Sequence, residues 1–319
     1  MKYKNFFTIL KYTLIVISIV YIYFNSKHNL KNVINEIELD LWVISFLIII
    51  RLVLHNVLSL RTFFFLKLTS KYKPKLFEWN RLYFSTALIN SMPSWGAGHF
   101  IRSFEMKMNH YSHTEYIGMY FFIYFWGILI NSILMAGTMI FTDQQNFYIF
   151  SILIALFLIS TLSISKKLLI IGNDIFKFFL TFKFLKEFKF LKYVSKKFLE
   201  MISISSKILL IRVFINFSFF TILTFFLQFY LFFSIFKYIF NFTDLNIILL
   251  LFLLNYLLKK VPSAESIIGI KETIFGIFAE QLGFIFIEGV LLSIILRLLN
   301  FISLVINYAF SFLTIKKSV

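Results

Sequence analysis

Residues 257–300 read LLKKVPSAESIIGIKETIFGIFAEQLGFIFIEGVLLSIILRLLN, an apolar sequence interrupted by Pro262, by serines and by Gly269. Proline lacks the amide donor that a helix interior needs, and glycine weakens a helical backbone, so we expect the helix to break here. Charged residues lie in this break and just after it: Glu265, Lys271, Glu272 and Glu280. In a membrane protein, a broken helix with charged residues is typical of groups that face a cavity and not lipid.

A second stretch, residues 90–102, has the same character. It reads NSMPSWGAGHFIR and contains Pro93, Gly96 and Gly98 ahead of Arg102. Both stretches therefore place a proline and at least one glycine shortly before a charged residue. We expect these two breaks to form the functional site and the other spans to support it.

The composition is that of a membrane protein. Sixty per cent of the 319 residues are hydrophobic and the mean hydropathy is +0.85, whereas soluble domains are about half apolar. Apolar runs of about 20 residues recur, and an α-helix needs this length to cross a bilayer. The sequence predicts an all-α, polytopic protein of the inner, or cytoplasmic, membrane with about seven or eight transmembrane helices.

The net charge of +17 and the absence of cysteine exclude several function classes. In a membrane protein, excess Lys and Arg is typical of cytoplasmic loops. Nucleic-acid binding would need a folded soluble domain, and the sequence predicts none. Without cysteine, the chain has no disulfides, thiolate metal sites or cysteine nucleophiles.

The apolar runs predict the order of the spans. We expect crossings at residues 6–24, 41–65, 117–141, 147–164, 208–236 and 245–258, and one long span or a half-helix joined to a full one at 285–314. The basic loop 67–81 is predicted to be cytoplasmic. Residues 82–92 are too short to cross, so we expect a re-entrant hairpin with residues 98–108 as its second arm. Lysines near the C-terminus favour a cytoplasmic end and a total of eight crossings, which requires residues 272–290 to cross or nearly cross.

The longest basic tract is residues 166–207, with ten lysines against three acidic residues. Phenylalanine and leucine alternate with these lysines, which predicts an amphipathic helix on the anionic cytoplasmic leaflet. We interpret the tract as a cytoplasmic connection within a single integral membrane domain, residues 1–319.

Polar residues also occur inside the predicted spans. Arg51 and His55 are one turn apart, and Ser293, Arg297, Asn300 and Asn307 share one helical face. An arginine inside a membrane is costly, so we expect these faces to point into the bundle. The simplest interpretation is a structural hydrogen bond between helices.

The two breaks suit anion binding. If a helix begins near Gly98, its free amides and dipole point back into the break, and His99 and Arg102 add donors. Gly269 leads into Lys271 and Glu272 in a similar way. A phosphate-bearing lipid would match a cavity between two such helix starts. The alternative is that Arg102, Glu272 and Arg297 pair with one another and only stabilise the bundle.

The sequence predicts neither an enzyme nor a cofactor. His110 and His113 stand three apart, but a zinc site needs further ligands, so we expect no metal. No nucleotide-binding loop or nucleophile motif is present. A membrane-embedded transferase would need a carboxylate cluster, for which Glu265, Glu272 and Glu280 are the candidates.

The two breaks resemble those of the lysylphosphatidylglycerol synthase/flippase transmembrane region family. Gly269, Glu272 and Arg297 match the Gly-x-x-Glu of that family and the arginine of its next helix. In the first break, Pro93, Gly96, Gly98 and Arg102 match the family pattern, but His99 stands where an acidic residue is usual. The aminoacyltransferase domain that some members carry is missing.

The resemblance implies a lipid flippase with two pseudo-related halves, each with a re-entrant break. It implies an aminoacylated phospholipid or a lipid-linked sugar as the substrate, with Gly96, Gly98, His99, Arg102, Gly269, Lys271, Glu272 and Arg297 around its headgroup. The alternative is a non-catalytic membrane scaffold that partners a glycosyltransferase or another lipid-modifying enzyme.

Overall fold

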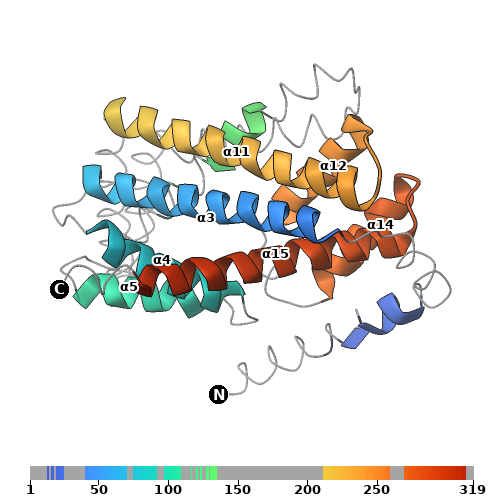
Figure 1. Cartoon of the computed structure of the whole chain (residues 1–319), viewed down its shortest axis with the longest axis horizontal. Helices are drawn as coiled ribbons and strands as arrows, with labels where there is room; N and C mark the ends of the chain where they lie inside the picture. Colours follow the sequence, from blue (N-terminus) through green and yellow to red (C-terminus); the bar gives the residue numbers. More distant parts are fainter. Residues whose placement is uncertain are drawn as a thin grey trace, which may run out of the picture. The chain divides into compact units, whose positions relative to one another are not determined.

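The computed structural model describes residues 40–69, 75–91, 97–108, 211–258 and 269–313, with single positions between residues 13 and 24 and between residues 116 and 134. Every regular element in these residues is a helix (Figure 1), as the sequence predicts. The helices with defined bounds are α3 (Leu41–Thr69), α4 (Leu76–Ser91), α5 (Ala97–Met108), α11 (Ile211–Ile239), α12 (Leu245–Leu258), α14 (Ile270–Gln281) and α15 (Phe286–Leu313).

Three of these helices are long and apolar enough to cross a membrane. They span Leu41–Leu68, Ile215–Ile239 and Phe286–Phe312. Each exceeds the about 20 residues that a crossing helix needs. The described part of the chain therefore has the long apolar helices of a membrane protein.

The remaining helices are short. Helices α5 and α14 have 12 residues each, which is about 18 Å of rise, well below the about 30 Å of a hydrocarbon core. The sequence of helix lengths is also similar in two parts of the chain. Helices α3, α4 and α5 have 29, 16 and 12 residues, and helices α11, α12 and α14 have 29, 14 and 12. Two related halves would give this order, and the relation itself stays a prediction.

The structure corrects one predicted span and decides between the two alternatives given for another. Residues 272–290 do not form one crossing helix, because α14 ends at Gln281 and the backbone turns through Gly283, whose φ is 88°. Helix α15 then runs without interruption, so 285–314 is one long span and not a half-helix joined to a full one. Helix α3 extends to Thr69 and α4 begins at Leu76, so both ends of the predicted loop 67–81 are helical.

Several predictions lie outside the described residues. They are the crossing at 147–164, the basic tract 166–207, the two prolines and Glu265, and most of the crossings at 6–24 and 117–141. The re-entrant course of the two breaks and the total of seven or eight crossings therefore stay predictions.

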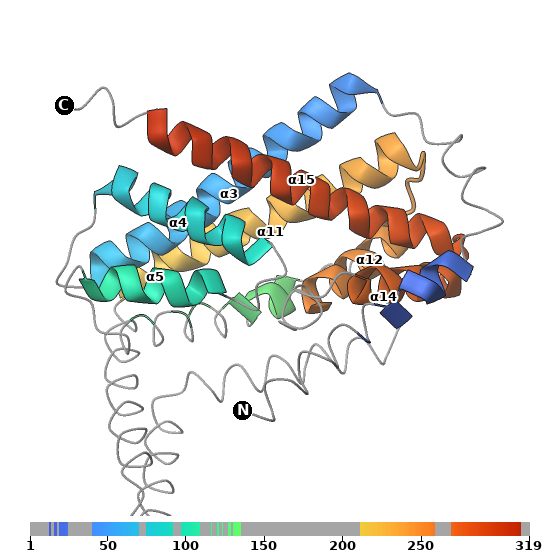
Figure 2. The ribbon, with the colours of Figure 1, turned by 90° about the horizontal axis from the view of Figure 1, so that it is seen from below.

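The contacts divide the chain into two compact units. The first unit contains Met1–Asn56, Asn80–Phe100 and Phe226–Val319, and the second contains Val57–Trp79 and Ile101–Phe225. Within the first unit, α14 packs along the N-terminal part of α15 and also contacts α12 (Figure 2). The second broken stretch lies wholly in the first unit, as does the first stretch up to Phe100, whereas Arg102 belongs to the second unit.

Aromatic side chains fill the interior of both units. In the first unit, the Phe252 ring of α12 lies 5.4 Å from Phe229 and 5.7 Å from Phe232, both on α11. In the second unit, Phe65 of α3 lies 5.9 Å from Phe217 of α11, edge to face. Such pairs add about 0.5–1.5 kcal/mol each beyond their buried area, so they fix α11 against its neighbours.

Candidate functional site

The start of α14 is built around Gly269. This residue has a φ of 98°, a left-handed conformation that glycine adopts without strain. Its carbonyl accepts the first helical hydrogen bond, from the Thr273 amide at 2.8 Å. The side chain of Glu272, the third residue of the helix, completes a capping box with the backbone of Gly269.

Glu272 folds back onto this helix start and also reaches α15. Its Oε2 accepts the Gly269 amide at 2.7 Å, and its Oε1 lies 2.5 Å from Nε of Arg297. Ser293, one turn before Arg297, donates to the same Oε1 at 3.5 Å. The carboxylate thus has a partner on each of two helices, which holds the start of α14 against α15.

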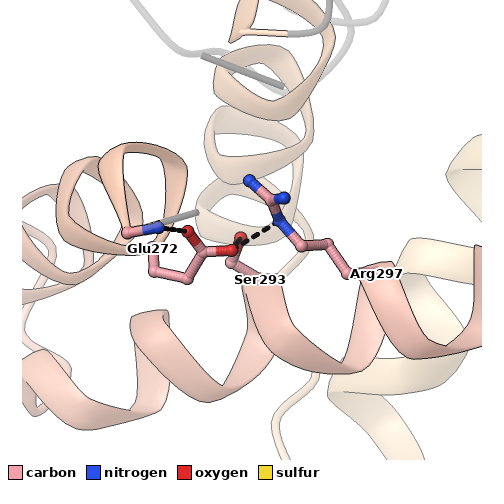
Figure 3. A network of polar contacts seen from close by, with 4 residues as sticks. Glu272, Ser293 and Arg297 are labelled. Atoms are coloured by element: carbon pink, nitrogen blue, oxygen red, sulfur yellow. Dashed lines mark hydrogen bonds and ion pairs between the residues drawn. The ribbon is translucent and has the colours of Figure 1, made fainter. Parts of the chain in front are cut away.

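The pair is buried at one end and open at the other. The Glu272 side chain is 5% exposed and the Arg297 side chain is 26% exposed. Figure 3 shows the Nε of Arg297 toward the carboxylate and the two terminal nitrogens of the guanidinium pointing away from it. The terminal nitrogens of Arg297 therefore lie on the side opposite Glu272.

Lys271 is a second buried charge at the start of α14. It is 3% exposed, and its ammonium lies 5.9 Å from the centroid of the Phe275 ring, one turn along α14. Consecutive residues of a helix point in different directions, so Lys271 and Glu272 face different surroundings although they are neighbours in the chain.

Two glycines let α14 approach α15 closely. A Cβ atom at Gly289 would overlap the backbone carbonyl of Phe275. One at Gly276 would lie 2.5 Å from the Phe286 ring. Small residues of this kind bring helix backbones together in membrane proteins, and here they place Arg297 within reach of Glu272.

The polar face of α15 continues to α3. Arg51 donates through Nη2 to Oδ1 of Asn300 at 2.5 Å, and Asn56 donates to Oδ1 of Asn307 at 2.8 Å. Because both residue numbers rise together, the two helices run in the same direction.

The predicted residues of the first break have a different setting. Gly98 and His99 lie in the backbone of α5, and Gly96 lies outside the described residues. Arg102 is 2% exposed, belongs to the second unit, and donates to the Tyr120 hydroxyl. On the same helix, the apolar Ile101 and Phe104 are exposed. The charged Glu105 and Lys107 are exposed as well, and the apolar Met106 is buried, so the exposed face of α5 carries both apolar and charged side chains.

The structure therefore brings together Gly269, Glu272 and Arg297, with Lys271 alongside. Sequence reasoning placed Ser293 on the face of Arg297 but did not include it in the site, and it gave Arg51 no partner. The helical spacing of polar residues on α15 was the available signal for Ser293. Among the residues that the structure describes, no group of three or more His, Asp or Glu side chains is arranged to hold a metal ion.

Comparison with known proteins gives no further assignment. No protein-family model, curated protein or solved structure matches the chain. The function is therefore inferred below from the site and from the sequence.

Proposed function

We propose that the chain is a flippase-like lipid transporter and that the start of α14 binds a phosphate-bearing headgroup. One observation supports this most directly: at the start of α14 the Glu272 carboxylate accepts the Gly269 amide and pairs with Arg297 of α15, whose terminal guanidinium nitrogens point away from that carboxylate. Helix N-termini bind phosphate through their amides and dipole. Arginine adds paired donors that match phosphate oxygens.

The surroundings of Arg297 favour a lipid over a soluble anion. Ile294 lies one turn before Arg297 and Phe301 one turn after it, and both side chains are exposed. The charged group thus interrupts an apolar stripe on α15. A headgroup bound at Arg297 would leave its acyl or prenyl chains against this stripe, where their burial is favourable.

The wider proposal follows the sequence. The headgroup would be bound between the breaks at 92–96 and 259–268, as in transporters whose broken helices meet at the bilayer midplane. The chain would be a multi-pass protein of the cytoplasmic membrane, and its substrate an aminoacylated phospholipid or a lipid-linked sugar. The roles of Gly96, Gly98, His99 and Arg102 and the family resemblance stay predictions.

Reconstitution into vesicles with fluorescent lipids tests the proposal, because a membrane-impermeant quencher reports how fast lipid leaves the inner leaflet. We expect wild-type protein to accelerate this exchange and Arg297→Gln to slow it about tenfold, the usual effect of losing a hydrogen bond to a charged group. Glu288→Gln is the matched control, since Glu288 also accepts an amide at a helix start but pairs with no arginine among the residues that the structure describes.

Equal exchange by wild type, Arg297→Gln and protein-free vesicles would overturn the transporter proposal. That result would favour the scaffold alternative, in which the charged cluster only stabilises the fold. Arg102→Ala is a further variant for the same assay, and an unchanged rate would remove Arg102 from the mechanism.

A further inference from the structure

We propose that Asn255 of α12 and Thr273 of α14 are specificity-determining residues of the same site, and that they bind the hydroxyl groups of a polyol headgroup, such as glycerol or a sugar. This inference deepens the proposed function and rests on it. It goes further by naming the neutral part of the ligand, which a phosphate contact at Arg297 does not select.

Both residues carry a buried oxygen that has no hydrogen-bond partner in the part of the chain that the structure describes. These atoms are Oδ1 of Asn255, a residue that is 3% exposed, and Oγ1 of Thr273. A buried oxygen without a partner is costly, because it has lost its bonds to water and gained none in return. Such atoms are uncommon in folded proteins, so each of them calls for an explanation.

Comparable residues in other described helices do have partners. The hydroxyls of Thr221 and Thr224 donate to the backbone carbonyls four and three positions earlier, each at 2.8 Å. This local bond is common for a threonine inside a helix, and Thr273 does not form it within the described helix α14. The amide of Asn56 likewise donates to Asn307 at 2.8 Å. The open oxygens of α12 and α14 therefore differ from their counterparts in the other helices.

The two open oxygens lie at about the same level of a helix pair. The ring of Phe242, just before α12, lies 4.8 Å from the ring of Phe284, just after α14. The start of α12 therefore adjoins the end of α14, and since the two helices are in contact, they run in opposite directions. At about 1.5 Å per residue, Asn255 is about 15 Å from the start of α12 and Thr273 is about 12 Å from the end of α14. Both residues thus lie close to the break at 259–268.

Thr273 also connects this level to the anion site. Its amide donates to the Gly269 carbonyl at 2.8 Å. The residue before it, Glu272, accepts the Gly269 amide and pairs with Arg297. We therefore assign the phosphate of the headgroup to Arg297 and the alcohol attached to that phosphate to the break between α12 and α14.

A similar open oxygen precedes the other break. Asn90, in the last turn of α4, has a buried Oδ1 without a hydrogen-bond partner among the described residues. Asn255 has the same place in the last turn of α12. Helices α4 and α12 are each the second in the two similar series of helix lengths. An open amide oxygen ahead of each break favours a role in binding over an accident of packing.

The chemistry of the two oxygens favours a neutral donor. An amide oxygen only accepts hydrogen bonds, and a hydroxyl both donates and accepts, so the pair matches the hydroxyls of a polyol. An ammonium group would also donate, but a buried charge needs an opposite charge beside it. Both side chains are neutral, and the neighbouring carboxylate of Glu272 already pairs with Arg297. A glycerol or sugar headgroup therefore fits better than the ammonium of an aminoacylated lipid.

The experiment measures binding of three lipids to the full chain in detergent–lipid micelles by microscale thermophoresis. Phosphatidylglycerol and phosphatidylethanol both carry one negative charge, but only the first has hydroxyls on its headgroup. A polyprenyl phosphohexose is the third lipid, and it distinguishes a sugar from glycerol as the source of the hydroxyls. The variants are Asn255→Leu and Thr273→Val, which replace the open oxygens by apolar groups. Asn56→Leu and Thr224→Val are the controls, because their polar groups have partners.

Thermal unfolding of the variants should separate stability from binding. Removal of an unpaired buried oxygen relieves its desolvation cost, so Asn255→Leu and Thr273→Val should keep or raise the thermal midpoint. Asn56→Leu leaves Asn307 without its donor and should lower the midpoint by about 2–4 °C.

In the binding assay, wild type should prefer at least one of the hydroxyl-bearing lipids to phosphatidylethanol. Asn255→Leu and Thr273→Val should each weaken binding of that lipid about three- to tenfold, the effect of losing one hydrogen bond, and leave phosphatidylethanol unchanged. Arg297→Gln should weaken binding of all three lipids, and Thr224→Val should weaken none. If Asn255→Leu does not fold, the isosteric variants Thr273→Val and Thr224→Val carry the same test.

Three results would count against the inference. An unchanged lipid preference in both folded variants, with binding still sensitive to Arg297→Gln, would mean that the oxygens bind only water, and the proposed function would stand. A midpoint lowered in Asn255→Leu and Thr273→Val as much as in Asn56→Leu would make the two oxygens structural. Binding of none of the lipids by folded wild-type protein would remove the proposed function and this inference together.

Discussion

Glu272 and Glu288 occupy the same position, the third residue of a helix, and each accepts the amide of the residue three positions earlier. The distances are 2.7 Å to the Gly269 amide and 2.8 Å to the Ile285 amide. Only Glu272 adds an ion pair, to Arg297 of a different helix. The first carboxylate therefore joins two helices, whereas the second caps its own.

This difference predicts unequal effects of the same substitution. Glu272→Gln should lower the free energy of unfolding by about 2–3 kcal/mol, because it leaves Arg297 without its counter-charge in a partly exposed site. Glu288→Gln should cost less than about 1 kcal/mol, since it alters only a helix cap. Thermal or denaturant unfolding in detergent measures both. A similar loss in the two variants would show that the ion pair contributes little.

The close approach of α14 and α15 predicts that Gly289 tolerates no side chain. Gly289→Ala would press a methyl group against the Phe275 carbonyl and should cost about 1–3 kcal/mol, as overpacking usually does. Gly127→Ala is the control, because a Cβ there meets nothing within 4 Å. The thermal midpoints of the two variants decide the point, and equal midpoints would contradict the packing described here.

The conformation of Gly269 predicts a graded response to substitution. At a φ of 98° an L-residue is strained by about 1–2 kcal/mol, and a β-branched residue by more. Gly269→Asn should therefore be milder than Gly269→Val, both in stability and in lipid exchange. An Asn variant as impaired as the Val variant would indicate that the space at Gly269, and not its backbone conformation, is what matters.

The exposed face of α5, which carries both apolar and charged side chains, predicts how the helix reacts with probes. The natural chain has no cysteine, so single cysteines can be introduced without background. In intact membranes, Phe104→Cys should resist a water-soluble maleimide and react with a lipid-soluble one, because its position is 59% exposed but apolar in character. Lys107→Cys, also exposed, is the comparison on the same helix. Rapid aqueous labelling of both would place α5 in water.

Much of the fold could be predicted from the sequence because it depends on local patterns. Uninterrupted apolar runs predicted α3, α11 and α15, and the break that ends at Gly269 ahead of Lys271 and Glu272 predicted a helix start there. The sequence allowed two interpretations of the charged residues, and in one of them Glu272 and Arg297 pair and stabilise the bundle. The structure contains that pair, and whether it also binds a ligand is the subject of the experiments above.

Other features could not be predicted because they depend on which helices are neighbours. Nothing in the spacing of Arg51 or Asn300 shows that α3 lies beside α15, since residues 249 positions apart carry no periodic relation. The turn at Gly283 was missed because the apolar run continues through it and a single glycine does not end a helix. The length of α14 thus came from the structure.

Helices α3 and α15 each continue for nearly 30 residues, which is about 40 Å, whereas a bilayer's hydrocarbon core is about 30 Å thick. Such helices fit by tilting or by thickening the bilayer around them. Because Arg51–Asn300 and Asn56–Asn307 link the two helices at two levels, they would have to tilt as a pair. The thickness of the surrounding membrane would then set the depth of Arg297, and a change of lipid chain length would raise or lower the site without altering any residue in it.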